Sequence, residues 1–145
     1  MKVIVQRVKQ AAVTADGEVT GQIGQGLLVF VGFTPTDRLE TIEQLAKKIV
    51  HLRIFDDTNG VMNDSLLDQG HSILSISQFT LYADTKKGHR PSYVLAAPKE
   101  QAITLYGLFN QALAQYCKVE TGRFGADMQV SLVNDGPVTI SLELD

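Results

Sequence analysis

The sequence predicts a single α+β domain over residues 1–145, with mostly antiparallel strands and two main helices. Apolar and polar residues alternate near both ends of the chain, which is the period of a strand with one buried face. Between these ends, two segments place apolar residues three and four positions apart, as on one face of a helix. Terminal strands with two separated helices favour an α+β arrangement over the strict alternation of a Rossmann sheet.

The first third of the chain is predicted to form strands. Val3 and Val5 alternate with polar neighbours, and Asp16-Gly17 is a strong hairpin signal. Residues 27–31 are a continuous apolar run, which is typical of a buried strand. A turn is expected at residues 56–60, because Asp, Asn and Gly favour turns and the ligand spacing of a calcium loop is absent.

Two helices are predicted from the apolar spacing. The first follows Asp37, which can cap it with Glu40 three residues later, and it extends to Arg53. The second has Pro98 at its first position and ends near Cys117, a lone cysteine expected to be a small core residue. Their apolar faces comprise Leu39, Ile42, Leu45, Ile49 and Leu52, and then Ala102, Leu105, Tyr106, Phe109, Leu113 and Tyr116.

Composition and charge restrict the function classes. A net charge of -3 and a pI of about 5.5 argue against a broad surface that neutralises phosphates, so any contact with RNA should be local. The one basic cluster, Lys86-Lys87-Gly88-His89-Arg90, is either a site for a few phosphates or a solvated loop. No signal peptide or transmembrane run is readable, and a single cysteine fits a reducing compartment, so we expect a cytoplasmic protein without membrane contact.

Standard catalytic and metal-binding motifs are missing. The chain has no GxSxG elbow, Walker loop, HExxH motif or paired cysteines. His51, His71 and His89 lack the spacing of metal ligands, and structural or surface roles are expected for them. The sequence therefore predicts no metal and no cofactor.

Two segments at strand ends form the candidate site. The first is Ser77-Gln78-Phe79-Thr80, at the end of a buried strand predicted over residues 73–79. Free backbone amides, the Gln78 side chain and the Thr80 hydroxyl could together hold an ester carbonyl as charge develops on it. Alternatively, Ser and Thr at this strand edge are only structural.

The second segment is Asn134-Asp135-Gly136-Pro137-Val138-Thr139, which separates strands predicted near residues 128–132 and 138–144. Glycine relaxes the backbone restrictions, and a cis X-Pro bond lies within about 1 kcal/mol of trans. A cis bond would turn the neighbouring carbonyls to one side. Alternatively, the segment is an ordinary turn, which these residues also favour.

These two segments and Thr121-Gly122-Arg123-Phe124-Gly125-Ala126-Asp127-Met128 resemble the signature motifs of the D-aminoacyl-tRNA deacylases. The similarity extends nearly end to end and includes Gln6-Arg7-Val8, Leu52-Arg53-Ile54-Phe55, Met62-Asn63 and Lys87-Gly88-His89-Arg90-Pro91. Ala12, Val61 and His89 depart from the family pattern, which has serine, lysine and asparagine there. Because Val61 carries no charge where the family pattern has a lysine, contact with the tRNA acceptor end would be weaker.

The resemblance implies a homodimer with a barrel-like core that hydrolyses the ester bond of D-aminoacyl-tRNA and releases the D-amino acid and tRNA. It implies that Gly136 and Pro137, joined by a cis bond, reach the neighbouring subunit's pocket and sterically reject L-aminoacyl substrates. Achiral glycine would pass this filter. The family's hydrolysis is assisted by the terminal ribose 2′-hydroxyl, which would explain the missing His–Asp pair.

The resemblance also assigns roles to single residues. Gln78, Phe79 and Thr80, with Ser77 beside them, line the carbonyl side, and the Phe79 amide is the expected oxyanion donor. Thr80 is either a nucleophile or a positioning residue, and the lack of an evident base favours positioning.

Three further residues are expected in the substrate-binding region. Phe124 lines the pocket of the terminal adenosine, unless it is only a core aromatic, and Met128 ends the same motif. Arg7 holds the Gly-Pro segment through its planar guanidinium, unless it is a plain surface arginine.

Two competing functions remain at this stage. A non-catalytic nucleic-acid-binding module is the alternative from another class, since domains of this fold bind DNA or accompany synthetases, but the acidic pI opposes it. An esterase that edits L-aminoacyl-tRNA would need a pocket open on the opposite face, which the intact Gly136-Pro137 pair opposes.

Overall fold

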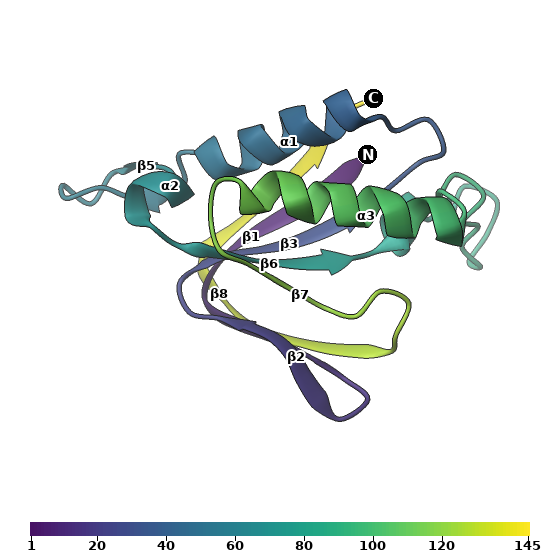
Figure 1. The fold of residues 1–145 in the computed structure, drawn as a ribbon, viewed down its shortest axis with the longest axis horizontal. Helices are drawn as coiled ribbons and strands as arrows, with labels where there is room; N and C mark the ends of the chain where they lie inside the picture. The colour runs from purple at the N-terminus through teal and green to yellow at the C-terminus, as the bar shows by residue number, and fades with distance from the viewer.

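The computed structural model describes all 145 residues and shows a strongly curved six-stranded sheet with two long helices packed over one part of it (Figure 1). The helices are α1, Leu39–His51, and α3, Lys99–Ala114. The strands of the sheet are β1 Lys2–Ala15, β2 Glu18–Ile23, β3 Gly26–Gly32, β6 Ser72–Ser77, β7 Val119–Thr121 and β8 Met128–Glu143. The predicted α+β class is confirmed.

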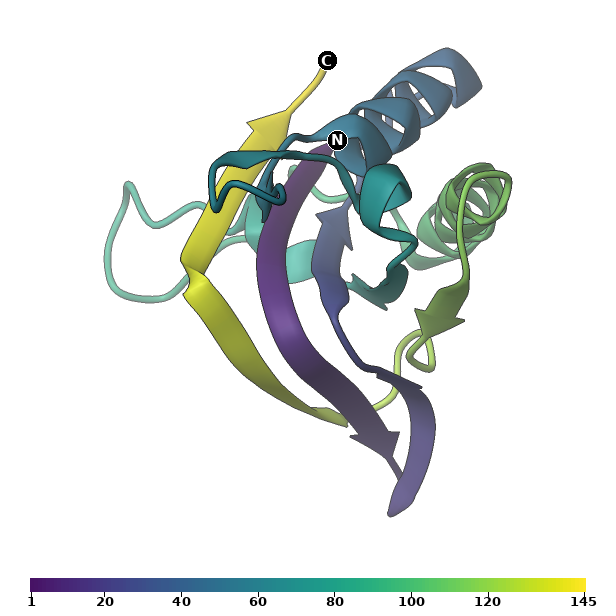
Figure 2. The ribbon, with the colours of Figure 1, turned by 90° about the vertical axis from the view of Figure 1, so that its left-hand side faces the viewer.

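Strand β1 organises the sheet because it has three partners. It pairs antiparallel with β8 along almost its whole length, with β3 through residues 2–8 and with β2 through residues 11–15. The sheet curls until β2 meets β7, where a Cβ added to Gly21 would lie 2.7 Å from the carbonyl oxygen of Thr121. The result is a nearly closed, barrel-like sheet, and Figure 2 shows its strands curving down the view.

Strand β6 is the exception to the antiparallel expectation, because it pairs in parallel with both β3 and β7. The chain between β3 and β6 contains α1 and a small unit formed by β4 Phe55–Asp56, β5 Met62–Asp64 and α2 Leu66–Gln69. The expected turn at residues 56–60 joins β4 to β5, where Asp57 accepts hydrogen bonds from the amides of Asn59 and Val61. Helix α2 was not predicted, because four residues are too few to show a helical period.

The core has two parts that follow the curvature of the sheet. The larger cluster lies between the sheet and helices α1 and α3, with Phe33 edge-to-face on Phe109 at 6.3 Å. The smaller cluster fills the barrel-like end and contains Val8, Ala11, Val13, Ile23, Leu28, Leu74 and Ile76. Burying a leucine or phenylalanine side chain contributes about 1.5–3 kcal/mol, so these clusters hold the strand ends in fixed positions.

The predicted start of the first helix is wrong by one residue, and so is its cap. Arg38 is the N-cap residue and its side chain forms no capping hydrogen bond. The Asp37 carboxylate instead accepts from the Thr34 amide at 2.7 Å and from the Met1 amino group at 2.6 Å. A fully buried ammonium group needs a charged partner, and this demand outweighs the local capping signal.

The ends of the second helix also shift slightly. Pro98 is the N-cap rather than the first helical residue, and Tyr116 lies beyond the last turn with 38% of its surface exposed. The other five predicted face residues are buried. Cys117 packs against the core as expected, and burial raises the pKa of its thiol to about 11, which makes it a poor nucleophile.

Two strand boundaries differ from the prediction in the candidate regions. Strand β6 ends at Ser77, and the chain then turns into the short 3-10 helix η1, Phe79–Tyr82. Strand β8 continues from Met128 to Glu143 through the expected turn, with a bend midway that is visible in Figure 2. The Gly136-Pro137 peptide bond within it is cis. The Asp16-Gly17 hairpin is confirmed, with φ of 51° and 79°.

Candidate functional site

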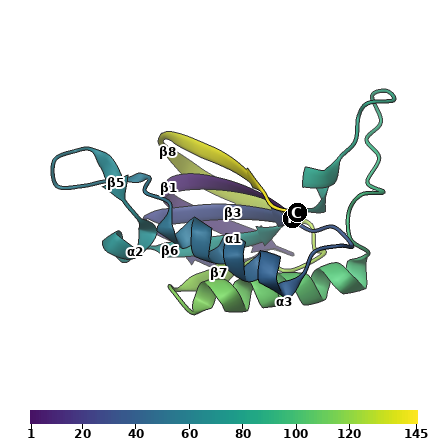
Figure 3. The same ribbon diagram turned by 90° about the horizontal axis from the view of Figure 1, so that it is seen from above.

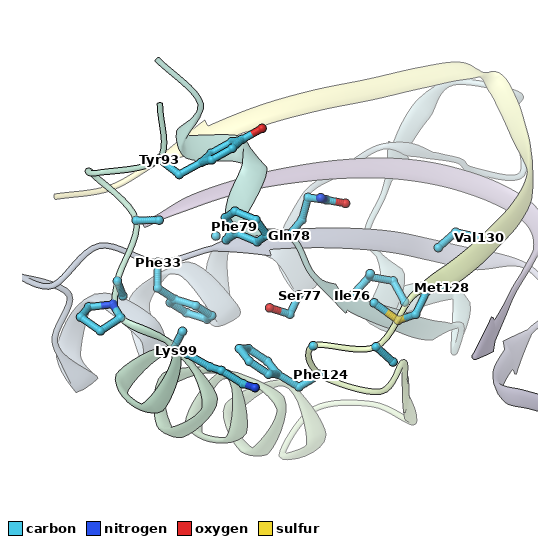
Figure 4. Close-up of a pocket in the computed structure, with 17 residues that line it drawn as sticks. Phe33, Ile76, Ser77, Gln78, Phe79, Tyr93, Lys99, Phe124, Met128 and Val130 are labelled. Carbon is cyan, nitrogen blue, oxygen red and sulfur yellow. The ribbon is translucent and has the colours of Figure 1, made fainter. Parts of the chain in front are cut away.

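A cavity of about 670 Å³ opens between the start of α3, the end of β6 and the segment that leads into β8 (Figure 4). Its volume is within the usual range for small-molecule sites. Most of its lining is apolar or aromatic. The lining residues are Gly32, Phe33, Ile76, Ser77, Gln78, Phe79, Tyr93, Ala96, Ala97, Pro98, Lys99, Ala102, Phe124, Gly125, Ala126, Met128 and Val130.

The first predicted segment forms the polar wall of this cavity. The Gln78 amide donates to the Val31 carbonyl at 2.7 Å, which is the last link to β3 before the chain turns into η1. Ser77, Gln78 and Phe79 line the cavity, and the Gln78 side-chain amide donates to Oγ1 of Thr80. Thr80 is half-buried and is not among the lining residues.

Helix η1 leaves backbone donors at this wall. The first N–H groups of a helix have no acceptor within the helix, and Phe79 is the first residue of η1. These donors are fixed to the end of β6 rather than to a flexible loop. The arrangement can therefore hold a carbonyl oxygen at the strand end without moving the backbone.

Aromatic side chains form two sides of the cavity. The exposed ring of Phe79 packs edge-to-face on Tyr93 with centroids 5.0 Å apart on one side, and Phe124 lies across from it (Figure 4). Phe124 packs against Tyr106 at 5.9 Å, and the Tyr106 hydroxyl donates to the Ser75 carbonyl at 2.7 Å. Phe124 is partly buried against the core and also lines the cavity, so it is not only a core aromatic, and its contact with the terminal adenosine stays a prediction.

The loop that contains Phe124 is tied to the β1–β2 hairpin. Arg123 donates to the Asp16 carboxylate at 2.8 Å and lies 3.7 Å from Glu18. Met128 lines the cavity at the start of β8, and a Cβ added to Gly122 would lie 2.6 Å from its sulfur. The absence of a side chain at Gly122 therefore gives Met128 its place in the cavity wall.

The cavity lacks a side-chain base. No histidine, aspartate or glutamate lines it, and Lys99 is the one basic residue among its lining residues. His71, whose pKa is lowered by burial, lies in a separate small cavity of about 140 Å³ beside Arg7. No group of three or more His, Cys, Asp or Glu side chains could hold a metal ion. The lining of this cavity therefore supplies backbone donors, the Ser77 hydroxyl, the Gln78 amide and one ammonium group.

The second predicted segment does not reach this cavity within the same chain. Gly136 and Pro137 are exposed and are absent from the cavity lining. Arg7 is only 7% exposed, so the surface alternative for it is wrong, and it donates to the carbonyl oxygens of Asp135 at 3.3 Å and Ile54 at 2.6 Å. In the amide orientation that satisfies all of its neighbours, Asn134 donates to the carbonyls of Arg7 and Val138 at 3.0 and 3.1 Å and accepts from the Thr139 hydroxyl at 2.9 Å. The segment is therefore held from both sides.

The model of the D-Tyr-tRNA(Tyr) deacylase family matches residues 4–143, nearly the whole chain. The protein belongs to this family. Its members are hydrolases that act on the ester bond of aminoacyl-tRNA, and the likeness inferred from the two segments is confirmed. No helix of this deacylase is long and apolar enough to cross a membrane.

Two solved structures extend the comparison. A protein described as c-Myc DNA Unwinding Element Binding Protein is 42% identical, with a TM-score of 0.95 over 100% of this chain and 99% of its own. A probable eukaryotic D-amino acid tRNA deacylase is 17% identical, with a TM-score of 0.85 over 99% and 98%. At this lower identity the likeness shows the fold alone.

Sequence reasoning missed several residues of the deacylase cavity. Tyr93 and Lys99 flank the second helix's start, and Phe33 follows β3, but none belongs to a recognisable motif. The sequence shows only that Tyr93 follows a basic cluster, and its exposure, which can mark a binding surface, becomes known only from the fold.

Proposed function

We propose that this protein selects D-aminoacyl-tRNA, hydrolyses its ester bond, and rejects the L-aminoacyl form. The observation that carries the proposal is an apolar cavity of nucleoside size, whose polar wall is backbone at the end of β6 and whose lining has no side-chain base. Such a site suits a substrate that brings its own reactive hydroxyl group. A cytoplasmic location fits this substrate and the single cysteine.

In the proposed complex, the terminal adenosine packs on Phe124 and the ester carbonyl points toward Gln78 and Phe79. Water attacks the carbonyl carbon, and the Phe79 amide stabilises the negative charge on the carbonyl oxygen. The ribose 2′-hydroxyl assists removal of the proton from water. The bond from the carbonyl carbon to the ribose 3′-oxygen then breaks, the 3′-oxygen takes a proton, and the free D-amino acid leaves.

Thr80 acts in this proposal as a positioning residue. Its hydroxyl accepts a hydrogen bond from the Gln78 side chain, which orients that amide at the cavity wall. An attacking hydroxyl needs a neighbouring base, and no imidazole or carboxylate lines the cavity. Ser77 lines the same wall and is assigned a role in orienting the ester.

Selection against L-amino acids is assigned to the main chain of Gly136 and Pro137. Backbone atoms cannot rotate away as a side chain can, so a misfitting substituent is rejected rather than accommodated. Arg7 and Asn134 hold this segment through the hydrogen bonds described above. Substrates without a side chain pass, so glycyl-tRNA is also hydrolysed.

The selecting segment is supplied by a second subunit in this proposal. Gly136 and Pro137 are exposed and lie outside the cavity of their own chain. They belong to β8, which pairs with β1 on one side and has no strand on its other side. A symmetric dimer would place the same exposed segment of each chain at the other's cavity, as a two-fold axis requires.

The test compares release of tyrosine from D-Tyr-tRNA and from L-Tyr-tRNA by the purified protein. We expect hydrolysis of the D ester at least about a hundredfold faster, because rejection by a stiff site is worth kilocalories. Equal rates for the two esters would refute the proposal. Gly-tRNA is the third substrate. Because glycine has no side chain, its hydrolysis would show that L-aminoacyl-tRNA is rejected because of the direction in which its side chain points.

The alternative function is non-catalytic binding of nucleic acid, because the 42% identical relative is described as a DNA Unwinding Element Binding Protein. A net charge of -3 opposes a broad phosphate-binding surface on this chain. Tight binding to duplex DNA without any release of tyrosine from D-Tyr-tRNA would favour this alternative.

A further inference from the structure

A long loop between η1 and α3 projects from the body of the molecule beside the cavity. Its base is closed by two backbone hydrogen bonds between Asp84 and Ser92, at 2.8 and 2.9 Å. In Figure 3 this teal-green loop extends away from both helices and the sheet. We call residues 84–92 the basic arm, because its exposed tip consists of Lys86, Lys87, Gly88, His89 and Arg90.

The cations of the basic arm have no partner in the protein. The lysine and arginine side chains of the arm form no ion pair, a property that they share with Lys47, Lys48 and Lys99, but only in the arm do three such cations lie within five residues. The one acidic residue of the arm, Asp84, accepts from the Lys86 backbone amide at 2.9 Å and so fixes the turn. Three adjacent free cations on a chain of net charge -3 form a local positive site.

The arm is joined directly to the cavity. Tyr93 follows the arm's base, lines the cavity and packs on Phe79, and Lys99 adds a further cation to the cavity lining. From the closed base, four residues lead to Gly88, which allows a reach of at most about 13 Å. A reach of this length extends from the nucleotide in the cavity toward the phosphates next to it.

We propose that the basic arm binds the backbone phosphates of the tRNA acceptor end, next to the nucleotide held in the cavity. This inference rests on the proposed function. The proposed contact is made by a whole tRNA but not by an isolated adenosine ester. Lys86, Lys87 and Arg90 supply the charge, and the closed base limits their distance from Tyr93. An anionic lipid surface is the competing source of phosphates, since the exposed Val94 and Leu95 follow the arm, and the experiment below separates the two.

The experiment uses the matched double variants Lys86→Ala/Lys87→Ala and Lys47→Ala/Lys48→Ala. The second pair removes the same two exposed charges from α1, away from the cavity lining. For each protein, kcat/KM is measured with D-Tyr-tRNA and with the 3′-ester of D-tyrosine and adenosine over a series of salt concentrations. The ratio of the two values isolates the contribution of the tRNA beyond its terminal nucleoside.

We expect the arm variant to lower this ratio about tenfold at low salt through KM, with the α1 variant at the wild-type ratio. The slope of log(kcat/KM) against log salt for D-Tyr-tRNA should fall by about 1.4, since each single-strand phosphate contact contributes about 0.7. An unchanged ratio and slope would overturn the proposal. So would an equal loss in both variants, or arm-dependent binding to phosphatidylserine vesicles with the ratio unchanged. Failure of the wild-type protein to hydrolyse either ester would instead refute the proposed function.

Discussion

The guanidinium of Arg7 contacts Asp135 at two atoms. The Arg7 Nε donates to the Asp135 carbonyl oxygen at 3.3 Å and lies 3.3 Å from the Asp135 carboxylate oxygen Oδ2. The Nη1 atom of the same guanidinium donates to the Ile54 carbonyl at 2.6 Å. One buried side chain therefore connects the residue before Gly136 to the segment that follows α1. This connection fixes the backbone to which we assign chiral selection.

Arg7→Lys should lower both stability and selectivity. A lysine ammonium cannot donate in the two fixed directions of the guanidinium, so one buried carbonyl loses its donor at a loss of about 1–3 kcal/mol. The ratio of D-Tyr-tRNA to L-Tyr-tRNA hydrolysis should fall at the same time, as measured with both esters. Lys9→Gln is the control, because Lys9 pairs with the same carboxylate at 3.6 Å but is more than half exposed, and such pairs contribute about 0–1 kcal/mol. Equal effects of both variants would contradict the role given to Arg7.

Gly26→Ala should disrupt the parallel pairing of β3 with β6. A Cβ at Gly26 would lie 1.9 Å from the Ser72 carbonyl oxygen, which is backbone and cannot move aside alone. We expect a loss of at least about 3 kcal/mol in the free energy of unfolding, measured with urea. Gly24→Ala, where nothing lies within 4 Å of the added Cβ, should stay within about 0.5 kcal/mol of wild type. Similar stability of the two variants would mean that this close approach does not exist.

Thr80→Ala should retain most of the activity. Removal of the hydroxyl frees the Gln78 amide that donates to it, so we expect a loss of about tenfold or less in kcat for D-Tyr-tRNA. Loss of a true nucleophile is far larger, on the order of a millionfold in a hydrolase. A dead Thr80→Ala variant, together with an acyl adduct on the wild-type protein in mass spectrometry, would make Thr80 the nucleophile.

The sequence predicted the composition of the polar wall well and its backbone less well. Three of the four residues predicted for this wall, Ser77, Gln78 and Phe79, line the cavity, whereas Thr80 does not, and their catalytic roles stay predictions. Strand β6 stops at Ser77 because the chain enters a 3-10 helix, which has no periodic signal. Gly136-Pro137 was expected to interrupt two strands, yet β1 extends pairing on both sides of the pair and keeps β8 continuous. Long-range pairing outweighed the local turn preference.

The capping and cavity residues show the same limit. Asp37 has the ordinary features of a helix cap, but its carboxylate instead accepts a hydrogen bond from the buried amino group of Met1, 36 positions away. Phe33, Tyr93 and Lys99 become neighbours of Ser77 only through the fold. Spacing along the chain shows which residues share a face, whereas these contacts join segments that share no local pattern.

Stability should depend on pH through His71. Burial lowers the pKa of His71 from its usual 6.5, so the unfolded chain binds the proton first as the pH falls. The stability contributed by neutral His71 is fully present above pH 6.5 and is lost below it, until the folded form is also protonated. The free energy of unfolding should therefore fall between pH 7 and 5 less steeply in His71→Gln than in wild type. Asp57 and Asp68, with pKa values lowered from 3.8, act only below this window. Parallel pH profiles of the two proteins would contradict the assignment.

The composite site can be tested by mixing two inactive variants. Phe124→Ala removes the aromatic wall of the cavity. Gly136→Ala places a Cβ 2.9 Å from Nη2 of Arg7 at a φ of 115°, and we expect this to shift the main chain into the space of the substrate, so that the cavity accepts neither ester. In a mixed dimer, one cavity keeps Phe124 and receives an intact Gly136-Pro137 segment from its partner. The other cavity carries both defects.

Turnover of D-Tyr-tRNA by the re-equilibrated mixture is therefore the most direct measurement, with chromatographic size and folding of both variants as controls. If each cavity is completed by the partner's Gly136-Pro137 segment, random mixing should restore about a quarter of the wild-type rate, because half of the dimers are mixed and each has one intact cavity. The restored activity should discriminate against L-Tyr-tRNA as the wild-type protein does. If the mixture is no more active than the two variants measured separately, the Gly136-Pro137 segment does not complete the neighbouring site, and its assignment to the partner subunit is wrong.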